Sequence, residues 1–129
     1  PVPARVVFVC TANSARSHLA TALWRRASRV PAESAGTHPG VRIDPGAIDA
    51  AARHGLPLRR VRPRVISDVV VENDLIITVC DLAHEELRGA TDLHWSVPDP
   101  VSVGTREAFD SALADLKSRV LSLVPRLAS

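Results

Sequence analysis

Residues 5–17 join an apolar run to a helix through a cysteine and an arginine six positions apart. The run VVFV predicts a buried strand over 5–10 that ends at Cys10. Arg16 follows five residues later, and the apolar spacing beyond it predicts a helix over 17–28. A strand that passes into a helix through so short a connection is typical of α/β folds.

Strands and helices alternate along the rest of the chain. Further strands are expected at 30–34, 74–80 and 93–97, and helices at 45–53, near 67–68, at 82–88 and at 105–127. An exposed connection is expected over 56–67, and a loop at Pro98-Asp99-Pro100. The pattern predicts an α/β fold, a small doubly wound, mostly parallel four-stranded sheet with helices on both faces. We expect one domain over residues 1–129; because the chain begins at Pro1 and holds no Met, excision from a longer chain stays open.

Composition excludes several classes of protein. The hydrophobic fraction of 46% argues against disorder, and no apolar run approaches the roughly 20 residues of a membrane span, so we expect a cytoplasmic protein with no membrane contact. A net charge of +2 and an aromatic fraction of 3% give no nucleic-acid surface, so nucleic acid is expected only if a missing N-terminal domain binds it. The five histidines show no metal-ligand spacing, so no metal is expected.

Three chemistry-bearing residues lie at or just past the carboxyl ends of predicted strands: Cys10, Cys80 and Asp99. In open parallel sheets, ligands bind beyond the carboxyl ends of the strands. The sequence therefore predicts that these three side chains share one edge of the sheet and one site.

The five residues between Cys10 and Arg16 can curl into a cradle whose backbone N–H groups bind a tetrahedral oxyanion. Arg16 can hold two of its oxygens, and the same positive field stabilises a Cys10 thiolate, to which Ser17 can donate while Asn13 fixes the loop backbone. The residues expected to bind the oxyanion are Thr11, Ala12, Asn13, Ser14, Ala15, Arg16 and Ser17. The alternative is a buried structural Cys10 and a surface Arg16.

At these residues the chain resembles the low-molecular-weight protein tyrosine phosphatase superfamily, which includes the thioredoxin-coupled type of arsenate reductase. The family pattern C-x-G-N-x-x-R-S is met at its cysteine, asparagine, arginine and serine, and fails at Ala12, where glycine is usual. A positive φ at Ala12 would strain its Cβ. The resemblance continues through Ser34-Ala35-Gly36-Thr37, Asp44-Pro45, Asp74-Leu75-Ile76 and Asp99-Pro100.

The resemblance implies that Cys10 is the nucleophile and Asp99 the general acid, with an Asx-turn before Pro100 as the alternative for Asp99. Phosphatases of the family usually carry an aromatic residue where this chain has Val101, and this chain has no Tyr. Val79-Cys80 and His94-Trp95 resemble the reductases instead. The reductase branch is therefore favoured.

In that branch, Cys10 attacks arsenate and a second thiol attacks the Cys10 sulfur, which releases arsenite. Cys80 matches the position of the second thiol, but Leu87 stands near the place of the usual third cysteine. Three outcomes follow: an external thiol resolves the adduct directly, a Cys10–Cys80 disulfide is reduced by an external dithiol, or Cys80 is merely buried. The reductant implied is a low-molecular-weight thiol or redoxin, from a mycothiol, glutathione or thioredoxin system, with no bound cofactor.

The sequence thus favours arsenate reduction through Cys10, Arg16, Asp99 and Cys80, with arsenate or phosphate as the bound oxyanion. A low-molecular-weight protein tyrosine phosphatase is the enzymatic alternative, because the cradle distinguishes arsenate from phosphate neither by charge nor by shape. A non-catalytic, oxyanion-binding regulatory module fused to an N-terminal domain is the third interpretation.

Overall fold

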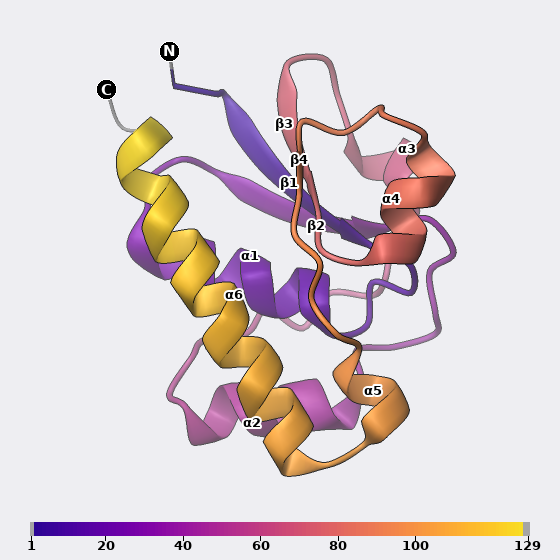
Figure 1. Cartoon of the computed structure of the whole chain (residues 1–129), viewed down its shortest axis with the longest axis vertical. Coiled ribbons are helices and arrows are strands. Elements are labelled where there is room, and N and C mark those ends of the chain that lie inside the picture. The colour runs from indigo at the N-terminus through magenta and orange to yellow at the C-terminus, as the bar shows by residue number, and fades with distance from the viewer. Residues whose placement is uncertain (1, 128–129) are drawn as a thin grey trace.

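The computed structural model describes residues 2–127 and contains one four-stranded parallel sheet (Figure 1). The strand order is β2-β1-β3-β4, and the strands are β1 (Arg5–Cys10), β2 (Ala32–Gly36), β3 (Asp74–Thr78) and β4 (Leu93–His94). The central strands are β1 and β3, with β2 on the outer side of β1, so the order in which strands are added across the sheet reverses after β2. This arrangement confirms the predicted fold class.

Helices cover the sheet on both sides (Figure 1). α1 packs on β1 and β2, α6 lies along α1, and α4 contacts β1 and β3. Because right-handed crossovers leave β1 and β3 in opposite directions, α1 and α4 lie on opposite faces. The helices are α1 (Arg16–Ala27), α2 (Pro45–Arg53), α3 (Ile66–Val69), α4 (Asp81–Leu87), α5 (Pro100–Val103) and α6 (Arg106–Leu127). No helix within residues 2–127 is both long enough and apolar enough to span a bilayer.

The core is built around β1, whose residues 6–9 are fully buried because strands of a parallel sheet have helices on both faces. Phe8 lies between two tryptophans, with ring centroids 6.0 Å from Trp24 and 5.7 Å from Trp95. Leu116 and Val120 of α6 complete the packing over α1. β1 is thus held rigidly at the centre, and its last residue, Cys10, is fixed with it.

The start of α2 confirms the helix start that Asp44-Pro45 predicted. The Asp44 side chain accepts a hydrogen bond from the Gly46 N–H at 2.8 Å, and Pro45 occupies the first helical position. Gly46 also lets α6 approach, since a Cβ there would lie 2.3 Å from Cε2 of Phe109.

Several element boundaries differ from the expected ones. β2 begins at Ala32 instead of Val30, because Pro31 has no N–H to donate and the Val30 carbonyl accepts from the Trp24 indole. β3 ends at Thr78, before Cys80, because Cys80 caps α4. β4 covers only residues 93–94.

The segment after β4 was expected to be a loop through Asp99-Pro100, and it instead enters the short helix α5. Asp99 caps α5, Pro100 takes its first position, and Gly104 ends it at φ 78°. These are the same signals that correctly predicted α2.

The 56–67 connection is less solvated than expected. Leu56 is buried, and Arg64 binds Glu33 of β2 at 2.8 Å. Arg25 and Arg59 reach the same carboxylate. Burial raises the pKa of Glu33, but the hydrogen bond from Arg64 and the charges of Arg59 and Arg25 outweigh it, so the net shift is downward.

Candidate active site

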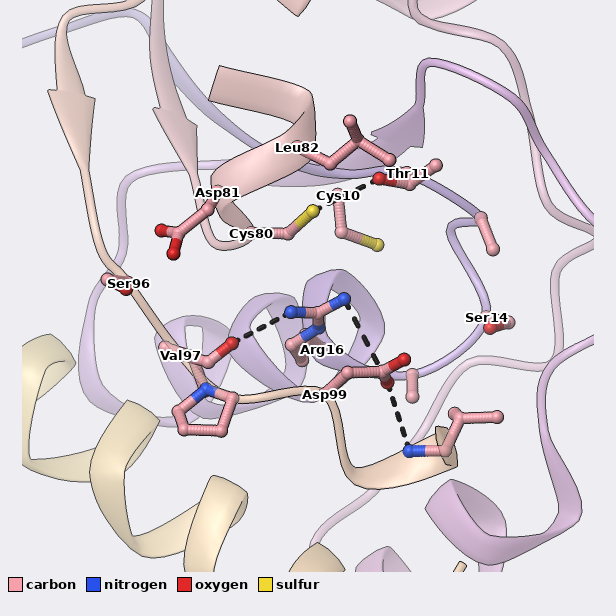
Figure 2. A pocket seen from close by; sticks show the side chains of 14 residues that line it. Cys10, Thr11, Ser14, Arg16, Cys80, Asp81, Leu82, Ser96, Val97 and Asp99 are labelled. Carbon is pink, nitrogen blue, oxygen red and sulfur yellow. Dashed lines mark hydrogen bonds and ion pairs between the residues drawn. The ribbon is translucent and has the colours of Figure 1, made fainter. Parts of the chain in front are cut away.

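A cleft of about 550 Å³ lies at the carboxyl edge of the sheet (Figure 2). Its walls come from three segments: the loop and helix start at residues 10–12 and 14–16, the start of α4 at residues 80–82, and residues 96–99 with Val101. Cys10, Cys80 and Asp99, which the sequence placed at one edge, therefore line one cavity.

The loop between β1 and α1 is held in its curve by the segment that follows β2. The N–H groups of Thr37, His38, Gly40 and Asp44 donate to the carbonyls of Cys10, Thr11, Ala12 and Ser14, at 2.8–3.1 Å. These four hydrogen bonds engage the loop carbonyls and hold the loop against the cleft, which Thr11, Ala12, Ser14 and Ala15 line.

Asn13 lies beneath this loop instead of in the cleft, is fully buried, and has φ 51°. Its Oδ1 accepts from the Arg64 N–H at 2.9 Å, and its Nδ2 donates to Ser17 Oγ at 2.7 Å. Asn13 therefore ties the loop to the 56–67 connection and to α1, not to the loop's own backbone as expected.

Ala12 is free of the strain that its Cβ could have caused. Within residues 2–127, the non-glycine residues with positive φ are Asn13, Asn73 and Arg88. The left-handed position in this loop thus falls on asparagine, which tolerates it better than most side chains. The absence of the usual glycine leaves the loop conformation undisturbed.

Hydrogen-bond donors converge on the sulfur of Cys10. Ser17 Oγ lies 3.0 Å from Cys10 Sγ, and the Asn13 N–H donates to the same sulfur at 3.2 Å. Ser17 Oγ also accepts from the Asn13 amide, and with Cys10 as a thiolate, which can only accept, the Ser17 hydroxyl is the donor to the sulfur. Asn13, Ser17 and Cys10 thus form one chain of hydrogen bonds at the N-terminus of α1.

His18 supports the loop from below. Its Nε2 lies 2.8 Å from the Asn13 carbonyl oxygen, and because that oxygen can only accept, Nε2 carries the proton. Burial lowers the pKa of His18 to about 4, a shift opposed by the hydrogen bond to Asn13 and assisted by Arg64 and Arg25. His18 is therefore a neutral structural donor at pH 7.

Arg16 is the one cationic side chain among the residues that line the cleft. Its Nη1 donates to the Val97 carbonyl at 2.7 Å, and its Nη2 lies 3.9 Å from Asp99 Oδ1 (Figure 2). These two contacts fix the plane of the guanidinium, whose remaining N–H groups are free for an oxyanion.

Asp99 takes the Asx-type arrangement that the sequence offered as one alternative, and its side chain also lines the cleft. Its Oδ1 accepts from the Val101 N–H at 3.0 Å, which is the Asx-type cap of α5, while its side chain lines the cleft and is 42% exposed. A half-exposed carboxylate in this position can exchange protons with a bound ligand.

Cys80 is buried, yet it belongs to the same cleft. Its Sγ lies 3.0 Å from Thr11 Oγ1 of the oxyanion loop and accepts from the Ala83 N–H at 3.4 Å as the cap of α4. The second thiol therefore touches the loop that holds the first (Figure 2).

One charged lining residue, Asp81, was not expected. Its Oδ1 accepts from His94 Nε2 at 2.8 Å, and His94 Nδ1 lies 2.8 Å from Thr78 Oγ1. A hydrogen bond from Ser96 and the interaction with His94 lower the pKa of Asp81. The adjacent Cys80-Asp81 pair was the only sequence signal for it.

Within residues 2–127, no group of three His, Cys, Asp or Glu side chains is placed to hold a metal ion. Of the predicted oxyanion-binding residues, Thr11, Ala12, Ser14, Ala15 and Arg16 line the cleft. Asn13 and Ser17 are buried behind it.

Comparison with known proteins extends over nearly the whole chain. The family model for Low molecular weight phosphotyrosine protein phosphatase matches residues 5–129. Arsenate reductase 1 of Staphylococcus epidermidis is 25% identical over 131 residues, covering 95% of this chain and 96% of that protein. The low molecular weight protein-tyrosine-phosphatase Wzb of Escherichia coli K12 is 34% identical over 122 residues, covering 81% and 82%.

The solved structures that resemble this chain include both an arsenate reductase and a tyrosine phosphatase. An arsenate reductase from Archaeoglobus fulgidus aligns with a TM-score of 0.78 at 30% identity, over 93% of this chain and 98% of that one. The tyrosine phosphatase Wzb from Escherichia coli K30, solved in complex with sulphate, aligns with a TM-score of 0.86 at 24% identity, over 98% and 100%.

Proposed function

Because this chain belongs to the low molecular weight phosphotyrosine protein phosphatase family, we propose that it reduces arsenate to arsenite, with Cys10 as nucleophile and an external thiol as electron source. Family membership alone leaves both reduction and phosphate-ester hydrolysis available, since reductases and phosphatases occur among the relatives. The choice between them rests on the cleft.

The observation that carries the proposal is the presence of two thiols in one cleft. Hydrolysis of a phosphate ester needs one nucleophile, whereas reduction of arsenic requires two electrons and hence a second sulfur. Cys80 lies against Thr11 of the oxyanion loop and lines the cavity with Cys10. The cleft walls also lack the aromatic side chains that would grip a phenyl ring.

In the proposed reaction, the loop N–H groups and Arg16 hold the arsenate oxygens while the Cys10 thiolate attacks arsenic. Asp99 protonates an oxygen that leaves as water, and a Cys10–arsenic adduct remains. The tyrosine phosphatase Wzb from Escherichia coli K30 was solved in complex with sulphate, which supports a tetrahedral oxyanion as a ligand of this fold.

A second thiolate then attacks the Cys10 sulfur. The new S–S bond forms as the S–As bond breaks, its electron pair passes to arsenic, and arsenite leaves. The attacking thiol is either an external low-molecular-weight thiol or Cys80, whose disulfide with Cys10 a redoxin would reduce. Since the sequence holds only two cysteines, no third thiol of this chain can carry a disulfide outward.

The test is arsenite production from arsenate, with thioredoxin, glutathione plus glutaredoxin, and mycothiol plus its redoxin supplied in turn. Cys10→Ser should abolish turnover with every donor. Turnover that requires one small thiol and survives Cys80→Ser assigns the second sulfur to that thiol. Loss of turnover in Cys80→Ser assigns it to Cys80, and no arsenite with any donor rejects the proposal.

Phosphate-ester hydrolysis is the second candidate, favoured by the 34% identity to Wzb and by an Asp99 that can protonate a leaving oxygen. It predicts turnover of an aryl phosphate without any thiol, and loss of that turnover in Asp99→Asn. An oxyanion that binds without turnover in either assay would instead indicate a regulatory module.

A further inference from the structure

The mouth of the cleft carries negative charge once the oxyanion is in place. Arg16 is the single cation in the lining, whereas Asp81 and Asp99 are both acidic. An arsenate or its Cys10 adduct neutralises Arg16, so the uncompensated charges that a second molecule meets are carboxylates. A molecule that enters after the oxyanion has bound therefore meets a more negative cleft mouth than the arsenate did.

Asp81 is placed to act on that second molecule instead of on the oxyanion. It stands at the first position of α4, directly after Cys80, on the wall that faces residues 96–99 (Figure 2). Its side chain is 67% exposed, so its charge is presented to whatever enters. Its one ion-pair contact within residues 2–127 is with His94, and the Arg16 charge that also lowers the pKa of Asp81 is the one that a bound oxyanion would neutralise.

The Asp81 carboxylate is also held in place. His94 binds its Oδ1, and His94 is itself fixed by Thr78 Oγ1 and by stacking on His84 with ring centroids 4.1 Å apart. The Ser96 side chain also hydrogen-bonds this carboxylate, which therefore stays at the edge of the cleft between the start of α4 and residues 96–99. Next to it, Leu82 is 52% exposed and Val101, across the mouth, is 38% exposed.

We propose that Asp81 is a specificity-determining residue that selects a second substrate thiol of neutral or cationic charge and rejects anionic thiols. This inference rests on the proposed function, because it concerns the thiol that attacks the Cys10–arsenic adduct. The thiolate attacks the Cys10 sulfur, the S–As electron pair leaves with arsenite, and a mixed disulfide between Cys10 and the small thiol remains for a further thiol to reduce. Leu82 and Val101 offer apolar contact to the body of that thiol.

The first test varies the charge of the thiol at pH 8, where imidazoles are largely neutral. Arsenite production is measured with cysteamine, 2-mercaptoethanol and 3-mercaptopropionate, in the wild type, Asp81→Asn and Asp81→Glu. We expect the cysteamine-to-mercaptopropionate rate ratio to fall about fivefold in Asp81→Asn and to be retained in Asp81→Glu. An unchanged ratio in Asp81→Asn overturns the inference while leaving the reductase proposal intact.

A second test is independent of reductase activity. In a Cys80→Ser background, the rates at which cationic 2-aminoethyl and anionic 2-sulfonatoethyl methanethiosulfonate modify Cys10 report the same charge at the same sulfur. The effect of Arg16 cancels when the rate ratio is compared between variants. Asp81→Asn should lower the cation-to-anion ratio about fivefold, and 0.5 M KCl should weaken the wild-type preference.

Glu85→Gln is the matched control, because it removes one negative charge from the same helix at an exposed position outside the cleft. An equal fall in the ratio in Glu85→Gln would assign the effect to net charge and overturn the inference. If no thiol yields arsenite, the reductase proposal fails, and the methanethiosulfonate ratio still decides whether Asp81 sets the charge preference at Cys10.

Discussion

At the scale of single residues, the reactivity of Cys10 depends on one hydroxyl. In the proposed reaction Cys10 attacks as a thiolate, which can only accept, so Ser17 donates to it and Ser17→Ala removes that hydrogen bond. We expect the rate of Cys10 alkylation by iodoacetamide at pH 7 to fall about tenfold. Ser122→Ala, an exposed change on α6, should leave the rate unchanged. An unaltered rate in Ser17→Ala would show that the Asn13 N–H and the helix terminus suffice.

Because the folded protein keeps His18 neutral, the free energy of unfolding falls in mild acid. Its pKa is about 4 in the folded protein because of burial, against an ordinary 6.5, so the unfolded chain binds a proton that the folded protein does not. The contribution of neutral His18 is therefore complete above pH 6.5 and is lost as the pH falls towards 4. The lost stability amounts to about 3 kcal/mol.

His18→Gln keeps a donor for the Asn13 carbonyl and removes this titration. The difference in the free energy of unfolding between wild type and variant, from urea unfolding at pH 4–8, should change across the window from 6.5 to 4. NMR titration of the wild type should show one imidazole that stays neutral to about pH 4. A difference that is independent of pH would contradict this account.

At the scale of elements, the end of β2 supports the oxyanion loop by close approach. A Cβ on Gly36 would lie 2.6 Å from the Thr11 carbonyl oxygen, so Gly36→Ala must displace the loop. A Cβ on Gly40 would lie 3.8 Å from the Ala12 carbonyl, an ordinary contact with the same loop. We expect Gly36→Ala to weaken phosphate binding at least tenfold by calorimetry, and Gly40→Ala to change it little. Equal binding in both variants would show that the loop tolerates displacement.

The elements also show what could be inferred from sequence. Buried β1 and the capped helix α2 were predictable, because an apolar run and an Asp-Pro cap are local signals. The α5 cap at Asp99-Pro100 carries the same signal but was interpreted as a loop, since four residues give no apolar period. The contacts of Asn13 with Arg64 and of Arg16 with Val97 join residues 51 and 81 positions apart. No local pattern records such pairs.

At the scale of the whole molecule, the carboxyl end of the sheet carries the candidate site and the amino end carries a stabilising ion pair. The carboxyl end holds the cleft, whereas the amino end holds Asp74, whose side chain is 2% exposed and binds Arg5 through both oxygens, at 3.0 and 2.7 Å. Burial raises the pKa of Asp74, but the hydrogen bonds from Arg5 and the Val71 N–H outweigh it, so the net shift is downward. The ionised carboxylate therefore stabilises the fold above its ordinary pKa of 3.8, and this contribution is lost as the pH falls further.

This separation predicts that stability can be lost without loss of the site. Asp74→Asn should lower the free energy of unfolding at pH 7 by about 2 kcal/mol, because Arg5 keeps its burial but loses its ionic partner. The same variant should alkylate Cys10 at the wild-type rate at 25 °C, since the six residues of β1 put about 17 Å between the two ends. Gly36→Ala should show the reverse pattern, with the larger effect at the cleft. Slower alkylation of Cys10 in Asp74→Asn would mean that a change at the amino end of β1 reaches the oxyanion loop, and it would contradict this prediction.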